Sequence, residues 1–366
     1  MSIVSWVLSI FPTPPYLLMP AAGLDISDHS VKFVEFLRTR RHGARLKRFA
    51  SVSVPHGVIE GGKVADKKKL IEILSSFSKK HKIHFVRASL PEEEGYIFPA
   101  YVPRGLTSDE IRESLKFKIE ENVPLSPDNA IIDYEIVPGA ATVPGQQMVS
   151  VSVYPSSVAE EYVGLLSAAG LETLSLEIEA QAVARAVVPK KSKAVAMVVD
   201  IGRKRSGISV VQGQTVRFTA TIDIGGDEID AVLQNVLPDA SGDDLVRIKN
   251  EEGLRYQNDA MGKEAFVSFA KRLSNELDRY IVYWQTHKDT KGYDVAHQSV
   301  EKIILVGGNA NIAGLPEYLE NALRVSVVKG NVWENAFSLD AFVPTLPETE
   351  SLGYAPAVGL ALHEDE

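Results

Sequence analysis

The chain has 366 residues, contains no cysteine and carries a formal net charge of −9 at pH 7. The absence of thiols excludes disulfides, thiolate metal sites and cysteine nucleophiles, and the net negative charge argues against general nucleic-acid binding. A chain of this length exceeds what one hydrophobic core usually supports, so two domains are expected.

Residues 1–22 form an apolar and proline-rich N-terminal segment. Its apolar run ends at Pro12, well short of the roughly 20 residues that a membrane-spanning helix needs, so no transmembrane segment is expected. Two interpretations stay open for this run. It is either a terminal segment packed on the body of the protein or an amphipathic helix for a membrane surface or a partner's groove.

A first domain is expected over residues 23–103. Asp25 stands at the end of a strand and opens a hairpin. The hydrophobic pattern predicts further strands over residues 31–36, 46–54 and 85–90, and a helix over residues 66–80.

An inserted module is expected over residues 104–153, followed by a return to the first domain over residues 154–193. Thr107 offers a capping start for the helix of the module. The other predicted elements are strands over residues 131–137 and 148–153 and helices over residues 158–169 and 177–187.

The stretch of residues 194–226 organises the second domain, which is expected over residues 194–345. A short Val-rich run ends at Asp200-Ile201-Gly202, as is typical of a buried strand that enters a tight turn. Gly202 lets the backbone approach a ligand closely. A carboxylate beside this turn and the Gly225-Gly226 turn suits a magnesium-bound polyphosphate, because magnesium prefers hard oxygen ligands.

The rest of the second domain contains helices and one more glycine turn. A helical subdomain is expected over residues 226–298, and residues 346–366 return to the first domain. The predicted helices cover residues 227–235, 243–250, 264–287, 314–323 and 358–362. A strand over residues 302–306 runs into Gly307-Gly308-Asn309, whose backbone N–H groups suit a nucleoside or phosphate.

Asp25 and Asp200 occupy the same place in similar strand-and-hairpin patterns, which indicates an internal repeat. If the halves face each other, both carboxylates and the Gly307 turn meet in one cleft. No Walker A motif, no dinucleotide-binding G-x-G-x-x-G after the early strands and no serine–histidine–carboxylate arrangement is recognisable.

This triplet of turns resembles the nucleotide-binding elements of the actin, hexokinase and Hsp70 superfamily. The chain is further similar to the PilM family, actin-like ATPases of type IV pilus assembly, and shares its plan with FtsA and the cytoplasmic part of GspL. The similar stretches are residues 24–27 (LDIS) with 31–35 (VKFVE), 119–124 (IEENVP) with 133–135 (DYE), 179–182 (EAQA), 304–315 (ILVGGNANIAGL) and 359–362 (GLAL).

The resemblance implies an α/β, actin-like (ribonuclease H-like) two-domain ATPase fold with an inserted small α+β module. It also implies ATP and Mg²⁺ as cofactors, with Asp25 and Asp200 holding the metal through water and Glu179 orienting the attacking water. The residues implied to contact the nucleotide are Asp25, Ser27, Lys32, Asp200, Gly202, Ser206, Gly225, Gly226, Lys249, Gly307, Gly308 and Asn309.

Two departures from the family pattern bear on activity. Ser27, Asp28 and His29 replace the glycine and small hydroxyl residues that the family usually has, and the turn at residues 203–205 is unusually basic. An extra carboxylate near a polyphosphate is unfavourable unless a cation or a turn engages it. Binding survives such changes more easily than hydrolysis, so hydrolysis is expected to be slow or absent.

The resemblance therefore implies an ATP-binding scaffold that docks on the N-terminal cytoplasmic peptide of a PilN-like membrane protein. Its location would be the cytoplasm, peripheral at the inner face of the membrane, with a pilus motor ATPase and a second copy of the chain as further candidate partners. The alternatives are an FtsA-like polymerising, membrane-associated cytoskeletal protein and a small-molecule kinase, although no substrate-site base is recognisable for the latter.

Overall fold

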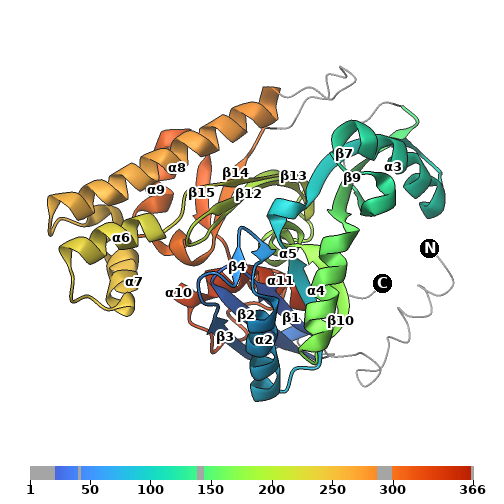
Figure 1. The fold of residues 1–366 in the computed structure, drawn as a ribbon. Coiled ribbons are helices and arrows are strands. Elements are labelled where there is room, and N and C mark those ends of the chain that lie inside the picture. Colours follow the sequence, from blue (N-terminus) through green and yellow to red (C-terminus); the bar gives the residue numbers. More distant parts are fainter. Residues whose placement is uncertain (1–20, 40–42, 138–143, 287–298, 364–366) are drawn as a thin grey trace.

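The computed structural model describes residues 21–39, 43–137, 144–286 and 299–363 (Figure 1). The apolar run after Met1 lies outside this part, as do residues 364–366, so the two interpretations of that run remain predictions. In the described ranges, no helix combines the length and the apolar character needed to cross a bilayer.

Two five-stranded sheets of the same topology organise the described residues. In each sheet, three successive antiparallel strands are followed by two strands that pair in parallel. The first sheet has the order β10 (Glu172–Ile178), β6 (Phe85–Leu90), β1 (Ala22–Ile26), β2 (Ser30–Thr39) and β3 (Gly43–Ser53). The second has the order β13 (Thr215–Ile222), β12 (Ser206–Gln212), β11 (Val195–Ile201), β14 (Lys302–Val306) and β15 (Ser326–Lys329). The predicted internal repeat is confirmed in this shared topology.

Helices cover the first sheet, which explains why β1 is buried along its whole length. Phe77 of α2 (Lys67–His81) packs edge-on against Phe33 of β2, and α2 also contacts α4 (Ser156–Ala168). The small hairpin β4 (Ile59–Glu60) and β5 (Lys63–Val64) precedes α2.

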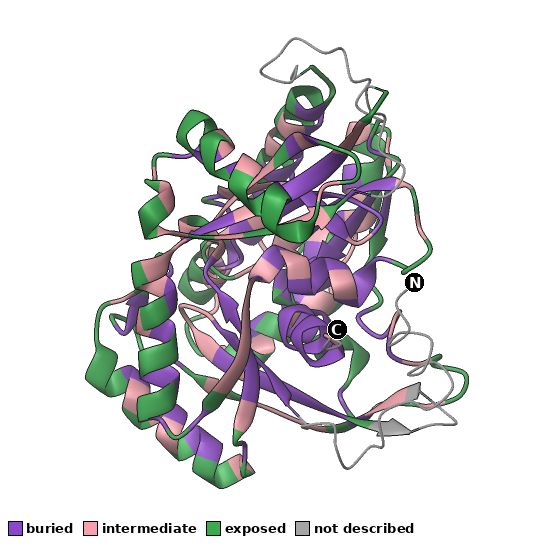
Figure 2. Cartoon of the chain, turned by 90° about the vertical axis from the view of Figure 1, so that its right-hand side faces the viewer, coloured by how far each residue is buried: buried purple, intermediate pink, exposed green. Residues whose placement is uncertain are grey.

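The helix α11 (Ala355–Leu362) lies in the middle of the molecule, and all its residues are buried (Figure 2). Because the helix is apolar on every side, only a fully buried position suits it. It packs against β1 and α5 (Glu179–Val187). A Cβ on Gly359 would lie 1.7 Å from the carbonyl oxygen of Ala182, so glycine permits this close approach of the two helices.

A three-stranded sheet with its own hydrophobic core forms the inserted module. Its strands are β7 (Tyr96–Pro103), β9 (Gln146–Pro155) and β8 (Ala130–Ile136), and its helix is α3 (Ser108–Asn122). Thr107 and Glu110 form the capping box that starts α3. The sequence predicts that the module starts at residue 104. In the structure, β7 is already part of the module's sheet, so the module starts at Tyr96.

The helices of the second half gather beside the second sheet (Figure 1). They are α6 (Asp227–Val236), α7 (Gly242–Glu251), α8 (Ala260–Thr286) and α9 (Leu315–Leu323), with the short α10 (Glu348–Ser351) following later.

The helix predicted over residues 177–187 is wrong in its first two residues, which belong to β10. The strands β7, β10 and β15 were not predicted. Strand β10 pairs in parallel with β6, and β15 pairs in parallel with β14. Parallel partners are not joined by a hairpin, so no local turn signal marks these strands.

Candidate functional site

A cavity of about 440 Å³ lies between the two halves, where the turns after β1, β6, β11 and β14 meet. Ligand sites of open α/β sheets lie outside the carboxyl ends of parallel strands, as here. The sequence-predicted residues that line this cavity are Asp25, Ser27, Lys32, Glu179, Asp200, Gly202, Gly307, Gly308 and Asn309.

Four other predicted residues lie behind this lining. Ser206 is fully buried, and its hydroxyl donates to the Ile224 carbonyl at 2.7 Å, so the hydroxyl holds the second sheet's edge together. Gly225 packs against the backbone of Arg203, in the turn that follows Gly202. A Cβ on Gly226 would lie 2.1 Å from the Oδ1 atom of Asn309. Lys249 does not line the cavity itself but donates from its Nζ atom to Asn309, a lining residue, at 3.0 Å.

Carboxylates converge on one side of the cavity. Burial raises the pKa of Asp25, which accepts a 3.0 Å hydrogen bond from the Ser89 hydroxyl. Burial also raises the pKa of Asp200 to about 6, although Lys32 opposes the rise. Burial and then the charges of Asp25 and Asp200 raise the pKa of Glu179 well above its usual value. These groups repel one another, so the site favours a cation or protons.

Glu92 adds a carboxyl group that the sequence analysis missed. It lines the cavity from the short helix η2 (Glu92–Glu94), and its Oε1 atom is buried without a hydrogen-bond partner. Burial, followed by the charges of Glu93 and Asp200, raises its pKa to about 8. The signal was present in the sequence, because an acidic triplet follows the predicted strand β6, whose carboxyl end must lie beside that of β1 if the two strands are parallel.

Lys32 brings positive charge to the same side of the cavity. It stands opposite Asp25 in the β1–β2 register, and its Nζ donates to the Gly353 carbonyl at 2.5 Å. The hydrogen bond to Gly353 therefore holds the ammonium group of Lys32 between the acidic side chains and the C-terminal segment of the chain.

The opposite side of the cavity consists of neutral groups held by a buried lysine. The Nδ2 atom of Asn309 donates to the Gly202 carbonyl at 2.8 Å, and its Oδ1 atom accepts from Lys249 Nζ at 3.0 Å. Lys249 also pairs with Asp230 at 2.8 Å. This chain of contacts ties the Gly202 turn, the Gly307 turn and α7 into one surface.

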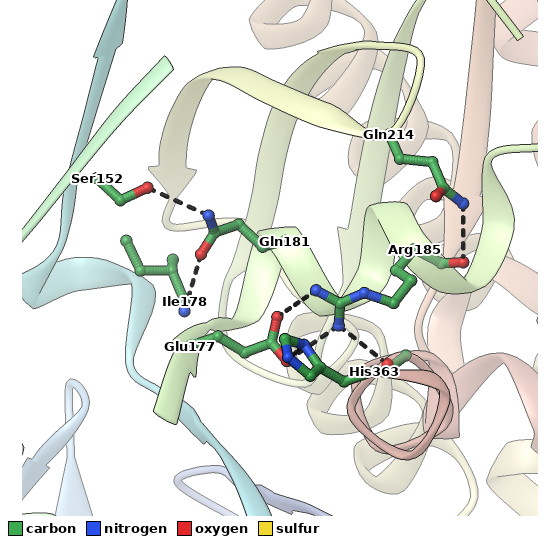
Figure 3. A network of polar contacts seen from close by, with 8 residues as sticks. Ser152, Glu177, Ile178, Gln181, Arg185, Gln214 and His363 are labelled. Atoms are coloured by element: carbon green, nitrogen blue, oxygen red, sulfur yellow. Dashed lines mark hydrogen bonds and ion pairs between the residues drawn. The ribbon is translucent and has the colours of Figure 1, made fainter. Parts of the chain in front are cut away.

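A polar network lies around the junction of β10 and α5, the helix that Glu179 begins (Figure 3). Arg185 of α5 pairs with Glu177 at 2.6 Å and donates to the Gly359 carbonyl of α11 at 3.0 Å. Burial alone would raise the pKa of Glu177, but hydrogen bonds from His363 and Arg185 bring it below its usual value. The network joins the end of β10, two residues before Glu179, to the last turn of α5 and to α11.

The residues present fit a magnesium-bound polyphosphate. Among the described residues, no group of three or more acidic or histidine side chains forms a ready metal cage. Magnesium is commonly held by one or two carboxylates together with phosphates and water, a role that suits Asp25 and Asp200. Such a metal would supply charge neutralisation at the phosphates.

The repeated sheets and the cleft between them define an actin-like α/β fold. Similar solved structures are a PilM-PilN type IV pilus biogenesis complex (TM-score 0.74, 21% identity, covering 94% of this chain and 98% of that chain) and EutJ from Carboxydothermus hydrogenoformans (0.54, 17%, 96% and 91%). MreB 5 of Spiroplasma citri bound to AMPPNP is a third (0.50, 10%, 93% and 94%).

The sequence places the chain within this class. The model of the family described as type IV pilus assembly protein PilM matches residues 23–365. The chain therefore belongs to the PilM family, and both the predicted family and the predicted fold are confirmed.

Proposed function

We propose that this chain binds ATP with Mg²⁺ in the cavity between its two halves and serves as a scaffold in type IV pilus assembly. The observation that carries the proposal is the meeting of Asp25, Asp200 and the Gly307 turn around one cavity in a chain that belongs to the PilM family. In this proposal the carboxylates hold the metal through water, and the Gly202 turn contacts phosphate.

The remaining sequence-predicted residues contact the nucleoside or support the residues that contact the ligand. Asn309 and Gly308 contact the nucleoside, Lys249 holds Asn309 in place, and Ser206 and the Gly225-Gly226 turn support the phosphate-side backbone. Glu179 is the candidate for orienting a water molecule. Slow or absent hydrolysis is proposed because an extra carboxylate, that of Asp28, lines the cavity and hydrolysis demands closer positioning than binding does.

The proposed partner is the N-terminal cytoplasmic peptide of a PilN-like membrane protein. The support is the likeness to a PilM-PilN complex, which covers 94% of this chain. This partner would place the chain in the cytoplasm at the inner face of the membrane. Binding of that peptide, measured by fluorescence anisotropy with and without ATP, tests the partner, and no binding in either state contradicts it.

Calorimetric titration of ATP with magnesium into the intact protein and into Asp200→Ala tests the nucleotide site. The expected result is saturable binding to the intact protein and binding at least tenfold weaker in the variant, because one of the two carboxylates that hold the metal through water is lost. Equal binding by both proteins would overturn the assignment of the cavity. Ala replaces a buried charge here, so a thermal unfolding scan accompanies each titration.

A further inference from the structure

One arginine spans the cavity between the two halves of the molecule. The Nη2 atom of Arg205, in the β11–β12 turn, lies 2.8 Å from Oδ2 of Asp28 in the β1–β2 turn. Its Nη1 atom lies 2.7 Å from Oε1 of Glu93 in η2. The guanidinium therefore joins the second half to two carboxylates of the first. Only 23% of the Arg205 side chain and 13% of the Asp28 side chain are exposed, so water screens the pair incompletely.

Asp28 receives further donors from the first half. Its two carboxylate oxygens accept hydrogen bonds of 3.1 Å from the backbone N–H groups of Gly61 and Gly62, in the β4–β5 turn. Successive backbone N–H groups together with an arginine are the donors that proteins commonly offer to a phosphate group. Asp28 thus fills an anion pocket with its own carboxylate, at the wall of the cavity proposed for the nucleotide.

We propose that Asp28 is a built-in anion that holds the cleft closed on Arg205 when no ligand is present. An incoming phosphate group competes with Asp28 for Arg205 and for the two glycine N–H groups. The competing ligand rests on the proposed nucleotide function, whereas the closed cleft does not.

The closed state is tested without any nucleotide. Because the chain has no cysteine, Ser76→Cys on α2 and Asp243→Cys on α7 place two spin labels on exposed positions of opposite halves. Pulsed EPR on the full chain then gives the distance between the halves. Arg205→Gln and Asp28→Asn are expected to lengthen or broaden this distance distribution.

Arg203→Gln is the matched control, because Arg203 lies in the same turn but pairs at 2.9 Å with Asp227 of its own half. Its distance distribution is expected to match that of the unsubstituted protein. Unchanged distributions in both Arg205→Gln and Asp28→Asn would overturn the closed cleft. If one of these variants fails to fold, as judged by circular dichroism, the other carries the test.

The competition is tested by calorimetric titration with tripolyphosphate and with magnesium ATP. Asp28→Asn is expected to bind both about tenfold more tightly than the unsubstituted protein, since the competing charge is gone. Equal or weaker binding by Asp28→Asn overturns the competition. If neither protein binds ATP while tripolyphosphate still binds more tightly to the variant, the nucleotide function fails and the anion pocket stands.

Discussion

Gly307 and Asp200 are in such close contact that a Cβ on Gly307 would stand 2.3 Å from Oδ1 of Asp200. The strands β11 and β14 pair in parallel with Asp200 opposite Val306, so the turn after β14 passes directly over the carboxylate. Gly307 also has a φ of 86°, which other residues adopt only with strain. A residue without a side chain is therefore required for two independent reasons.

Gly307→Ala is expected to lower the free energy of unfolding by about 2 kcal/mol, because it combines a strained backbone with a displaced Asp200. It is also expected to remove most magnesium ATP binding. Urea unfolding and calorimetry measure the two effects. Gly308→Ala is the control, since a Cβ there meets no atom within 4 Å. A loss of stability as large in the control would show that the turn itself, and not the contact with Asp200, decides the result.

The stability of the ligand-free protein is expected to increase as the pH falls from about 8 toward 6. The pKa of Glu92 is about 8 against an ordinary 4.5, so in this range the folded protein holds a proton that the unfolded chain has lost. Asp200, with a pKa of about 6, acts in the same direction at the lower end.

Thermal unfolding from pH 6 to 8 checks this dependence, and Glu92→Gln should flatten it. Glu72→Gln, at an exposed position of α2, is the matched control and should leave it intact. Magnesium should also flatten the dependence, because a bound cation favours the charged carboxylates. A Glu92→Gln protein with the original slope would exclude Glu92 as the titrating group.

Arg185→Ala is expected to destabilise the fold by about 2 kcal/mol, because the largely buried Glu177 carboxylate loses one of its two partners, Arg185 and His363. The exposed fractions of the two side chains are 19% and 10%, so the cost stays at or below that of a fully buried pair. The double variant Glu177→Leu with Arg185→Met should recover part of the loss, since the buried carboxylate is removed together with its arginine. Urea unfolding of the three proteins decides, and a double variant no better than Arg185→Ala would contradict this account.

Lys249→Met should weaken the binding of magnesium ATP about tenfold and leave tripolyphosphate binding unchanged. Lys249 holds Asn309 on the neutral side of the cavity, whereas the phosphates would face the acidic side. The expected loss of binding free energy is about that of one hydrogen bond to a charged group. Paired calorimetric titrations measure both ligands. Arg247→Ala, an exposed residue of the same helix, is the control. Equal weakening of both ligands would assign Lys249 to the phosphate side.

The sequence predicts the repeated strand-and-hairpin units well, because in both of them the strands are continuous apolar runs that end at an acidic residue and a turn. Asp25, Asp200 and the Gly307 turn can be placed in one cleft on this basis alone. Glu92 follows a predicted strand, but its place in the cleft depends on the parallel pairing of β6 with β1, and parallel partners are distant in sequence. The same holds for β10, where helical residues were expected at positions 177–178.

The partners of Asp28 are a different case. Asp28 and Arg205 are 177 residues apart in the sequence, and nothing local joins them. Only the facing of the two sheets brings Arg205 to Asp28. Local patterns thus predict the elements and the turn residues, whereas contacts across the cleft depend on how the halves pack.

The burial of α11 has a consequence for how the chain is made. The helix that completes the core around β1 is built from residues 355–362, and the segment just before it contacts both halves, through the Leu352 carbonyl to Gly307 and the Gly353 carbonyl to Lys32. The strand β1 therefore depends for its cover on a helix that lies far from it along the chain. Such long-range contacts slow folding, and a chain truncated before residue 355 leaves β1 without this cover.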